Sequence, residues 1–228
     1  MRMLLRLLPL LVVLGVVAPP AAAQVECQDM NGSQISGCIS TDGPWVSAPP
    51  RTGDNQYAGV WEVDCQPNQA LVGTDWTTPS FLQLGDLLVY IQQFGAQRLF
   101  GDAPGALFLA VNPKTAARSF MPSIGCLPSS ATAGARAAGF RAPRTFTHNL
   151  RPGREATHRH RCRRGERLVH STTGVGFFKE QPPSARELRD VEVDHRQRRG
   201  RAIVTVTTGR RAGDNERVAL QIHVTCRR

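Results

Sequence analysis

Two stretches of the chain repeat one pattern and decide its fold: Val60-Trp61-Glu62-Val63-Asp64-Cys65 and His158-Arg159-His160-Arg161-Cys162. Each is followed, after five residues, by an apolar pair, Leu71-Val72 in the first copy and Leu168-Val169 in the second. Because side chains alternate between the two faces of a strand, each cysteine shares a face with the residues two and four positions before it. The repeated pattern predicts two related β segments.

Both copies also close in the same way, with an alternating run that ends in a cysteine, at Cys126 and at Cys226. The interval from Cys65 to Cys126 is nearly equal to that from Cys162 to Cys226. Many short apolar runs broken by glycine and proline are typical of a sandwich or small barrel. We therefore predict an all-β fold of two tandem related domains, sandwich-like or barrel-like, each closed by one disulfide.

The N-terminus has the features of a cleavable secretory signal. Arg2 and Arg6 precede an apolar run over residues 7–17, and small residues follow up to Ala23. This order predicts a signal peptide over residues 1–23. No later stretch approaches the roughly 20 apolar residues of a membrane helix, so the mature chain is expected without a transmembrane segment. The expected location is secreted or extracytoplasmic, in a periplasm or cell envelope.

Export changes how the six cysteines are interpreted, because disulfides persist in oxidising compartments. Six cysteines allow about 15 pairings, and the duplication with its spacing favours one of them. The predicted disulfides are Cys27–Cys38, Cys65–Cys126 and Cys162–Cys226.

Composition divides the mature chain into four parts. Residues 24–57 are expected to form a disulfide-stapled segment, with a hairpin or loop around Asn31-Gly32 and then a connector marked by prolines. Residues 58–128 form the first β domain, although Leu87, Leu88, Ile91 and Phe94 would also suit a short helix within residues 86–100. Residues 129–144, rich in Ala, Gly and Ser, are the predicted linker. Residues 145–228 form the second domain.

The formal net charge of +10 is unevenly distributed. The 18 acidic residues divide equally at residue 130, whereas nearly all basic residues of the mature chain lie beyond it. Those before residue 130 are Arg51, Arg98, Lys114 and Arg118. The first domain is therefore mildly acidic and the second strongly basic, and their complementary charges could orient one against the other.

Arginines concentrate around two strand-like segments of the basic domain, and we interpret them as an anion-binding set. They are Arg159, Arg161, Arg163, Arg164, Arg196, Arg198, Arg199 and Arg201. If both segments belong to one sheet, their outward side chains merge into a basic face that attracts anions in a salt-dependent way. Anionic envelope polymers, lipid headgroups or an acidic protein are the expected partners. Nucleic acid is disfavoured by export and by the scarcity of aromatic residues for base stacking.

A second candidate is the trio His158, His160 and Cys162, which share one face of a strand. Two imidazoles and a thiolate are a plausible partial ligand set for zinc or copper. The predicted disulfide would remove the Cys162 thiolate, and the neighbouring arginines would repel a cation. The alternative is a structural histidine pair.

Motifs of the common enzyme classes are missing from the sequence. It contains no Gly-x-Ser-x-Gly elbow, no His-Glu-x-x-His and no phosphate-binding glycine loop. Asp194-His195 could be drawn into a triad, but acidic residues between arginine clusters more often act as counter-charges. We therefore expect a non-enzymatic exported protein without a cofactor, with a metal- or thiol-dependent activity and a purely structural envelope role as the alternatives.

Overall fold

The computed structural model describes residues 27–28, 34–51, 59–66, 69–74, 81–84, 86–94, 104–128, 143–212 and 216–228. The predicted signal peptide, and the predicted linker up to residue 142, lie outside these residues. The described chain is nearly all β, as expected, with several antiparallel sheets and one short helix, α1 (Ala185–Arg189). No helix in this part of the chain has the length and apolar composition needed to span a bilayer.

The strands form five sheets, and every strand pairing within them is antiparallel. In the first half of the chain (residues 27–128) the strands are β1 (Cys27–Gln28), β2 (Gln34–Ile35), β3 (Ile39–Asp42), β4 (Trp45–Ala48), β5 (Gly59–Asp64), β6 (Gln69–Thr74), β7 (Phe81–Leu84), β8 (Leu87–Phe94), β9 (Gly105–Val111), β10 (Arg118–Phe120) and β11 (Ser123–Pro128). In the second half (residues 143–228) they are β12 (Arg144–Asn149), β13 (Glu155–Arg161), β14 (Arg167–Phe178), β15 (Val191–Arg198), β16 (Arg201–Thr208) and β17 (Arg217–Arg227).

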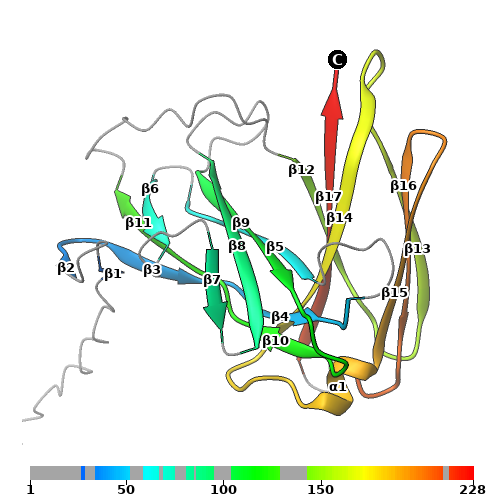
Figure 1. Cartoon of the computed structure of the whole chain (residues 1–228), viewed down its shortest axis with the longest axis horizontal. Coiled ribbons are helices and arrows are strands. Elements are labelled where there is room, and N and C mark those ends of the chain that lie inside the picture. Colours follow the sequence, from blue (N-terminus) through cyan, green and yellow to red (C-terminus); the bar gives the residue numbers. More distant parts are fainter. Residues whose placement is uncertain are drawn as a thin grey trace, which may run out of the picture.

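The second half is a sandwich of two layers (Figure 1). One layer is β13-β16-β15, and the other is β14-β17-β12, which belongs to a larger five-stranded sheet. Alternate residues of β16 and β17 meet in the core between the layers, among them Val204, Val206, Leu220 and Ile222. Burying such aliphatic side chains contributes about 1.5–3 kcal/mol each.

The first half contains the sheets β5-β9-β8-β7 and β3-β11-β6. Its core gathers around Trp61, Phe108 and Ile124, all buried. Residues 87–94 form strand β8, so the helical alternative is wrong for this segment. Val89 and Ile91 lie two positions apart and are both buried, which is the period of a strand. Residues 95–100 lie outside the described part.

Strand order is the same in two places. The order β3-β11-β6 corresponds to β12-β17-β14, and β5-β9-β8 corresponds to β13-β16-β15. The disulfides occupy matching positions: Cys65–Cys126 joins the end of β5 to β11, and Cys162–Cys226 joins the end of β13 to β17. With Cys27–Cys38, all three predicted disulfides are confirmed. Three disulfides suggest an oxidising, extracytoplasmic environment.

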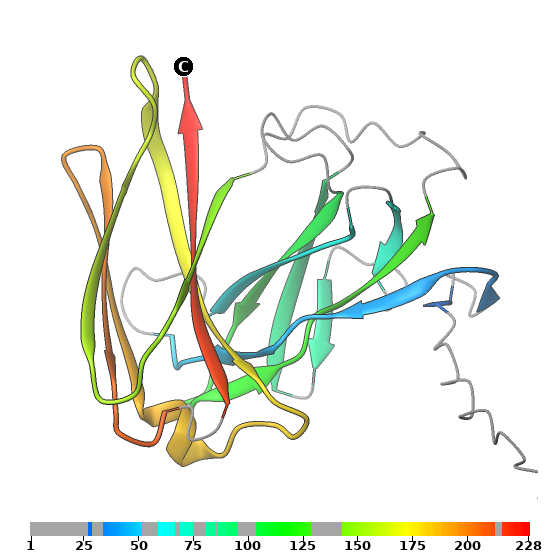
Figure 2. The same cartoon turned by 180° about the vertical axis from the view of Figure 1, so that it is seen from behind.

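Two strands, β3 and β4, lie where the sequence predicts a proline-marked connector without regular structure. Prolines at positions 44 and 49 flank β4 without interrupting it, which the ends of a strand tolerate. β4 pairs with β14, where Val46 lies opposite Gly176 and Trp45 opposite Phe177. With β10 beside β4, the five-stranded sheet β10-β4-β14-β17-β12 contains strands of both halves (Figure 2).

The two halves also meet where β5 crosses the five-stranded sheet. A Cβ at Gly174 of β14 would overlap the backbone carbonyl of Val60, so glycine permits this close approach. As a result both faces of β17 are buried: Leu220 and Ile222 face the sandwich core, whereas Gln221 and His223 face the first half.

Candidate functional site

The arginines of the predicted anion-binding set come together on the outward face of the β13-β16-β15 sheet. His158 and His160 face the sandwich, so the intervening residues of β13 face outward. Strand register places Arg161, Arg201 and Arg198 side by side in one row across the three strands. The next row holds Arg159 and Arg196 on either side of Ile203.

The other three arginines lie in the two adjoining turns. Arg163 and Arg164 follow β13, and Arg199 lies in the turn between β15 and β16. Both turns lie at the end of the molecule that carries the C-terminus (Figure 1). All eight arginines are exposed. We refer to Arg159, Arg161, Arg163, Arg164, Arg196, Arg198, Arg199 and Arg201 as the arginine patch.

Carboxylates lie beside two members of the patch: Glu166 is close to Arg163, and Asp194 is close to Arg196. Arg196 forms an exposed ion pair with Asp194, with 2.9 Å between nitrogen and oxygen. Among the described residues, no carboxylate lies within ion-pair distance of Arg159, Arg161, Arg198 or Arg201. Like charges directly opposite on neighbouring strands destabilise a sheet. The row Arg161–Arg201–Arg198 is therefore unfavourable for folding in the absence of a bound anion.

The opposite end of the same face is acidic. Glu155 and Glu192 flank Thr207 in one row, and Thr157 and Thr205 share a hydrogen bond of 3.1 Å in the next. Charge on this face therefore changes from negative to positive along the strands. An anion is directed to one end of the sheet rather than to its whole surface.

The inward face of β13 carries an aromatic stack. His158 and His160 meet His148 and Phe146 of β12, the strand that precedes β13 in the chain. Phe146 stacks on His160, and His148 stacks on His158, with 3.9 Å between ring centroids in both pairs. The Nε2 atoms of His148 and His160 are 3.0 Å apart.

Burial and mutual repulsion keep these rings neutral. Burial lowers the pKa of all three histidines, and the neighbouring imidazoles lower the pKa of His158 and His160 further. For His160 the pKa falls to about 4. The Nε2 of His158 is buried and has no hydrogen-bond partner within the described part of the chain.

The candidate trio His158, His160 and Cys162 does not offer a thiolate, because Cys162 is bonded to Cys226 in the predicted disulfide. The structure brings His148 to the two predicted histidines instead. His148 was missed because it lies on a different strand, although residues 144–149 also alternate Thr145, Thr147 and Asn149 with Phe146 and His148.

A second histidine cluster lies where β14 meets β15. His195 Nε2 lies 2.7 Å from the Oγ of the buried Ser171. Burial, followed by the charge of His170, lowers the pKa of His195, and Asp194 opposes this shift. Asp194 faces outward and binds Arg196, so it does not orient the His195 ring for a triad.

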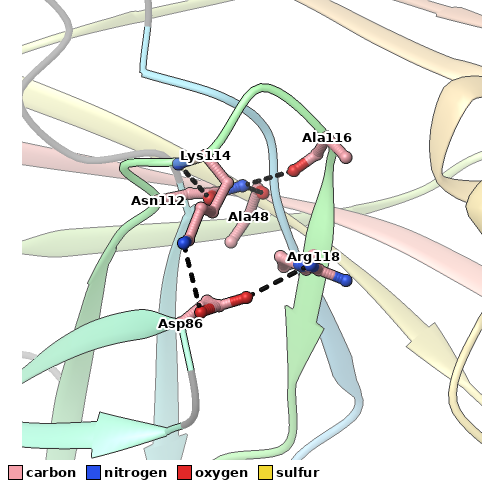
Figure 3. A network of polar contacts seen from close by, with 6 residues as sticks. All are labelled: Ala48, Asp86, Asn112, Lys114, Ala116 and Arg118. Carbon is pink, nitrogen blue, oxygen red and sulfur yellow. Dashed lines mark hydrogen bonds and ion pairs between the residues drawn. The ribbon is translucent and has the colours of Figure 1, made fainter.

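In the first half, Asp86 pairs with both Lys114 and Arg118, at 3.4 Å and 3.2 Å, beside the buried Asn112 (Figure 3). Its charge is thus already neutralised by the protein.

Comparison with known protein families, with curated proteins and with solved structures found no match to this chain, so the sites of this protein are interpreted from their geometry.

Proposed function

We propose that the protein binds an anionic polymer through the arginine patch. The row Arg161–Arg201–Arg198 carries this proposal, because three arginines lie side by side on neighbouring strands without a carboxylate in ion-pair distance among the described residues. Such a row is costly in the free protein and becomes favourable when phosphate or carboxylate groups lie over it.

Geometry favours a polymer over a small ion. Neighbouring strands are about 4.8 Å apart, and alternate residues of a strand about 6.6 Å apart. The arginines therefore project from two neighbouring rows of the sheet, and each guanidinium group can bind one anionic group through two parallel hydrogen bonds. A chain with repeated phosphate, sulfate or carboxylate groups can cover both rows, whereas a single ion reaches only neighbouring members of them.

Composition favours a polymer over the two other expected partners. The two arginine rows contain no aromatic residue or methionine, which enrich the centres of protein interfaces. They also contain no large apolar side chain other than Ile203, so little apolar surface is available to enter a lipid layer. An acidic protein and a lipid headgroup remain as outcomes of the test.

The wider setting is that of an exported, non-enzymatic protein of a periplasm or cell envelope, made of two related domains behind a cleaved signal peptide. Three disulfides and the repeated strand order support this setting.

The test is a titration of the oxidised mature protein with fluorescent long-chain polyphosphate, from about 50 mM to about 0.5 M salt. The variant Arg161→Gln/Arg198→Gln/Arg201→Gln should weaken binding at low salt by at least about tenfold. The slope of log affinity against log salt concentration should fall by an amount that corresponds to about two to three fewer released counterions. The matched control is Arg151→Gln/Arg154→Gln/Arg210→Gln, which removes the same charge from the other end of the second half and should have a small effect.

Two results would contradict the proposal. One is an equal loss in both triple variants, which would make net charge the cause. The other is affinity that does not change with salt. Parallel titrations with poly-glutamate and with phosphatidylglycerol vesicles separate the partners: binding only to one of these would assign the patch to an acidic protein or to a lipid surface.

A further inference from the structure

The imidazoles of His148 and His160 converge from two different sheets. His148 belongs to β12, the last strand of the five-stranded sheet, and His160 to β13, the first strand of the three-stranded sheet. Both are edge strands, so the two rings meet at an open side of the sandwich. Both residues are half-buried, which leaves them accessible to a small solute.

Stacking holds the two rings in place. Phe146 packs on His160, and His158 packs on His148, both with 3.9 Å between centroids. The converging Nε2 atoms are 3.0 Å apart. In the free protein one ring must donate its Nε2–H to the lone pair of the other, because two lone pairs at this distance repel.

This separation matches the distance between two neighbouring ligands of one metal ion. The ring centroids lie 5.2 Å apart, so the two Nε2 atoms point almost directly at each other, and both rings must tilt to face a shared ion. With metal–nitrogen bonds of about 2.0–2.1 Å, two nitrogens 3.0 Å apart subtend about 94° at the ion. That angle is close to the right angle between adjacent ligands in tetragonal and octahedral complexes. Metal binding does not require the release of the shared hydrogen as a proton. The ring that donates it in the free protein can carry it on Nδ1 instead.

We propose that His148 and His160 form a binding site for a divalent transition-metal ion, with Cu²⁺ bound most tightly. Copper(II) has the highest affinity for nitrogen ligands among the divalent first-row ions, and it favours tetragonal geometry. Water completes the coordination at the open edge. This site is independent of the arginine patch, because the patch lies on the other face of β13.

The nearby positive charge does not occupy the site. Arg159 and Arg161 alternate with His158 and His160, so they face outward while the imidazoles face β12. Neutral imidazole is the form that ligates metals. A cation at this edge therefore meets two neutral nitrogen ligands held by stacked rings, with the guanidinium groups behind the strand.

The test uses protein purified without a histidine tag, stripped with a chelator and titrated with Cu²⁺, Ni²⁺ and Zn²⁺ by calorimetry. We expect one ion per chain, with Cu²⁺ bound most tightly. His148→Gln and His160→Gln should each weaken Cu²⁺ binding by at least about tenfold. His170→Gln removes an exposed imidazole elsewhere and should leave the affinity unchanged.

Electron paramagnetic resonance of the unmutated protein provides a test that does not depend on variants folding. Bound Cu²⁺ should show hyperfine splitting from imidazole nitrogens. A spectrum without nitrogen splitting would overturn the proposal, as would Cu²⁺ affinity that persists in the His148→Gln/His160→Gln double variant.

Discussion

The side chain of Gln221 on β17 pairs with the backbone of Glu62 on β5 as a neighbouring strand would. Its Oε1 accepts a hydrogen bond of 2.8 Å from the Glu62 N–H, and its Nε2 donates one of 3.2 Å to the Glu62 carbonyl. Both residues are buried. β5 is an edge strand, and its backbone groups at this position would otherwise lack a partner away from water. One side chain thus satisfies the strand edge where the two halves meet.

Replacing Gln221 by leucine should therefore destabilise the protein. Leucine has a side chain of similar size, but it leaves the Glu62 N–H and carbonyl buried without these partners. We expect this to lower the free energy of unfolding by about 2–4 kcal/mol. Urea unfolding followed by circular dichroism measures this change. The control Gln197→Leu, at an exposed position of β15, should change stability by less than about 0.5 kcal/mol. Equal stability of the two variants would show that the Gln221 pairing contributes nothing.

Gly174 should not tolerate even alanine. Its Cβ would overlap the Val60 carbonyl, and both partners are backbone in paired strands that cannot easily move apart. We expect Gly174→Ala to lower the free energy of unfolding by at least about 2 kcal/mol. Thr207→Ala, on the exposed face of β16, is the control and should cost less than about 1 kcal/mol. Unfolding curves that coincide for both variants would mean that β5 and β14 are not in close contact.

Asn112 fixes the connection between β9 and β10. Its Nδ2 donates to the carbonyls of Ala48 and Ala116, and its Oδ1 accepts from the Lys114 N–H, as Figure 3 shows. Because Asn112 is fully buried, Asn112→Ala should leave these backbone groups without their partners and lower the free energy of unfolding by about 2–4 kcal/mol. The adjacent Asp86→Asn breaks only exposed ion pairs and should cost about 0–1 kcal/mol. Comparable losses in thermal unfolding would assign the stability to the ion pairs instead.

Periodicity explains which parts of the fold could be predicted. The alternating run that ends at Cys226 predicts a strand with one apolar face, and Leu220 and Ile222 on that face are buried, but alternation could not show that Gln221 and His223 are buried as well. Their burial comes from β5, more than a hundred residues earlier in the chain. The four-residue strand β4 was missed because it is too short for alternation to register between its flanking prolines. The helix α1 was missed although its capping box, Ser184 and Glu187, is visible in the sequence.

The candidate sites also divide into one that alternation predicts in part and one that only the folded chain shows. Alternation within β13 and β15 placed Arg159, Arg161, Arg196 and Arg198 on outward faces, and register then joined them into rows. The pairing of His148 with His160 depends on two sheets closing over each other. No spacing within a single strand encodes such a contact, so only the folded chain reveals it.

Glu187 should make the stability of the second half depend on pH in the acid range. The Lys179 ammonium, 2.6 Å away, together with hydrogen bonds from Ser184, lowers the pKa of Glu187 from 4.5 to about 2. A carboxylate with a lowered pKa in the folded state stabilises the protein above its unfolded pKa, and this contribution disappears as pH falls from about 4.5 towards 2.

Glu187→Gln isolates this effect, because glutamine can keep the capping box while the charge is lost. Relative to the unmutated protein, the variant should be less stable by about 1 kcal/mol at pH 7, and the difference should vanish near pH 2. Urea unfolding at pH 7, 4.5 and 2.5 measures it, with the exposed Glu180→Gln as a control of equal charge change. A stability difference that stays constant across these pH values would show that the Lys179–Glu187 pair does not act through its charge.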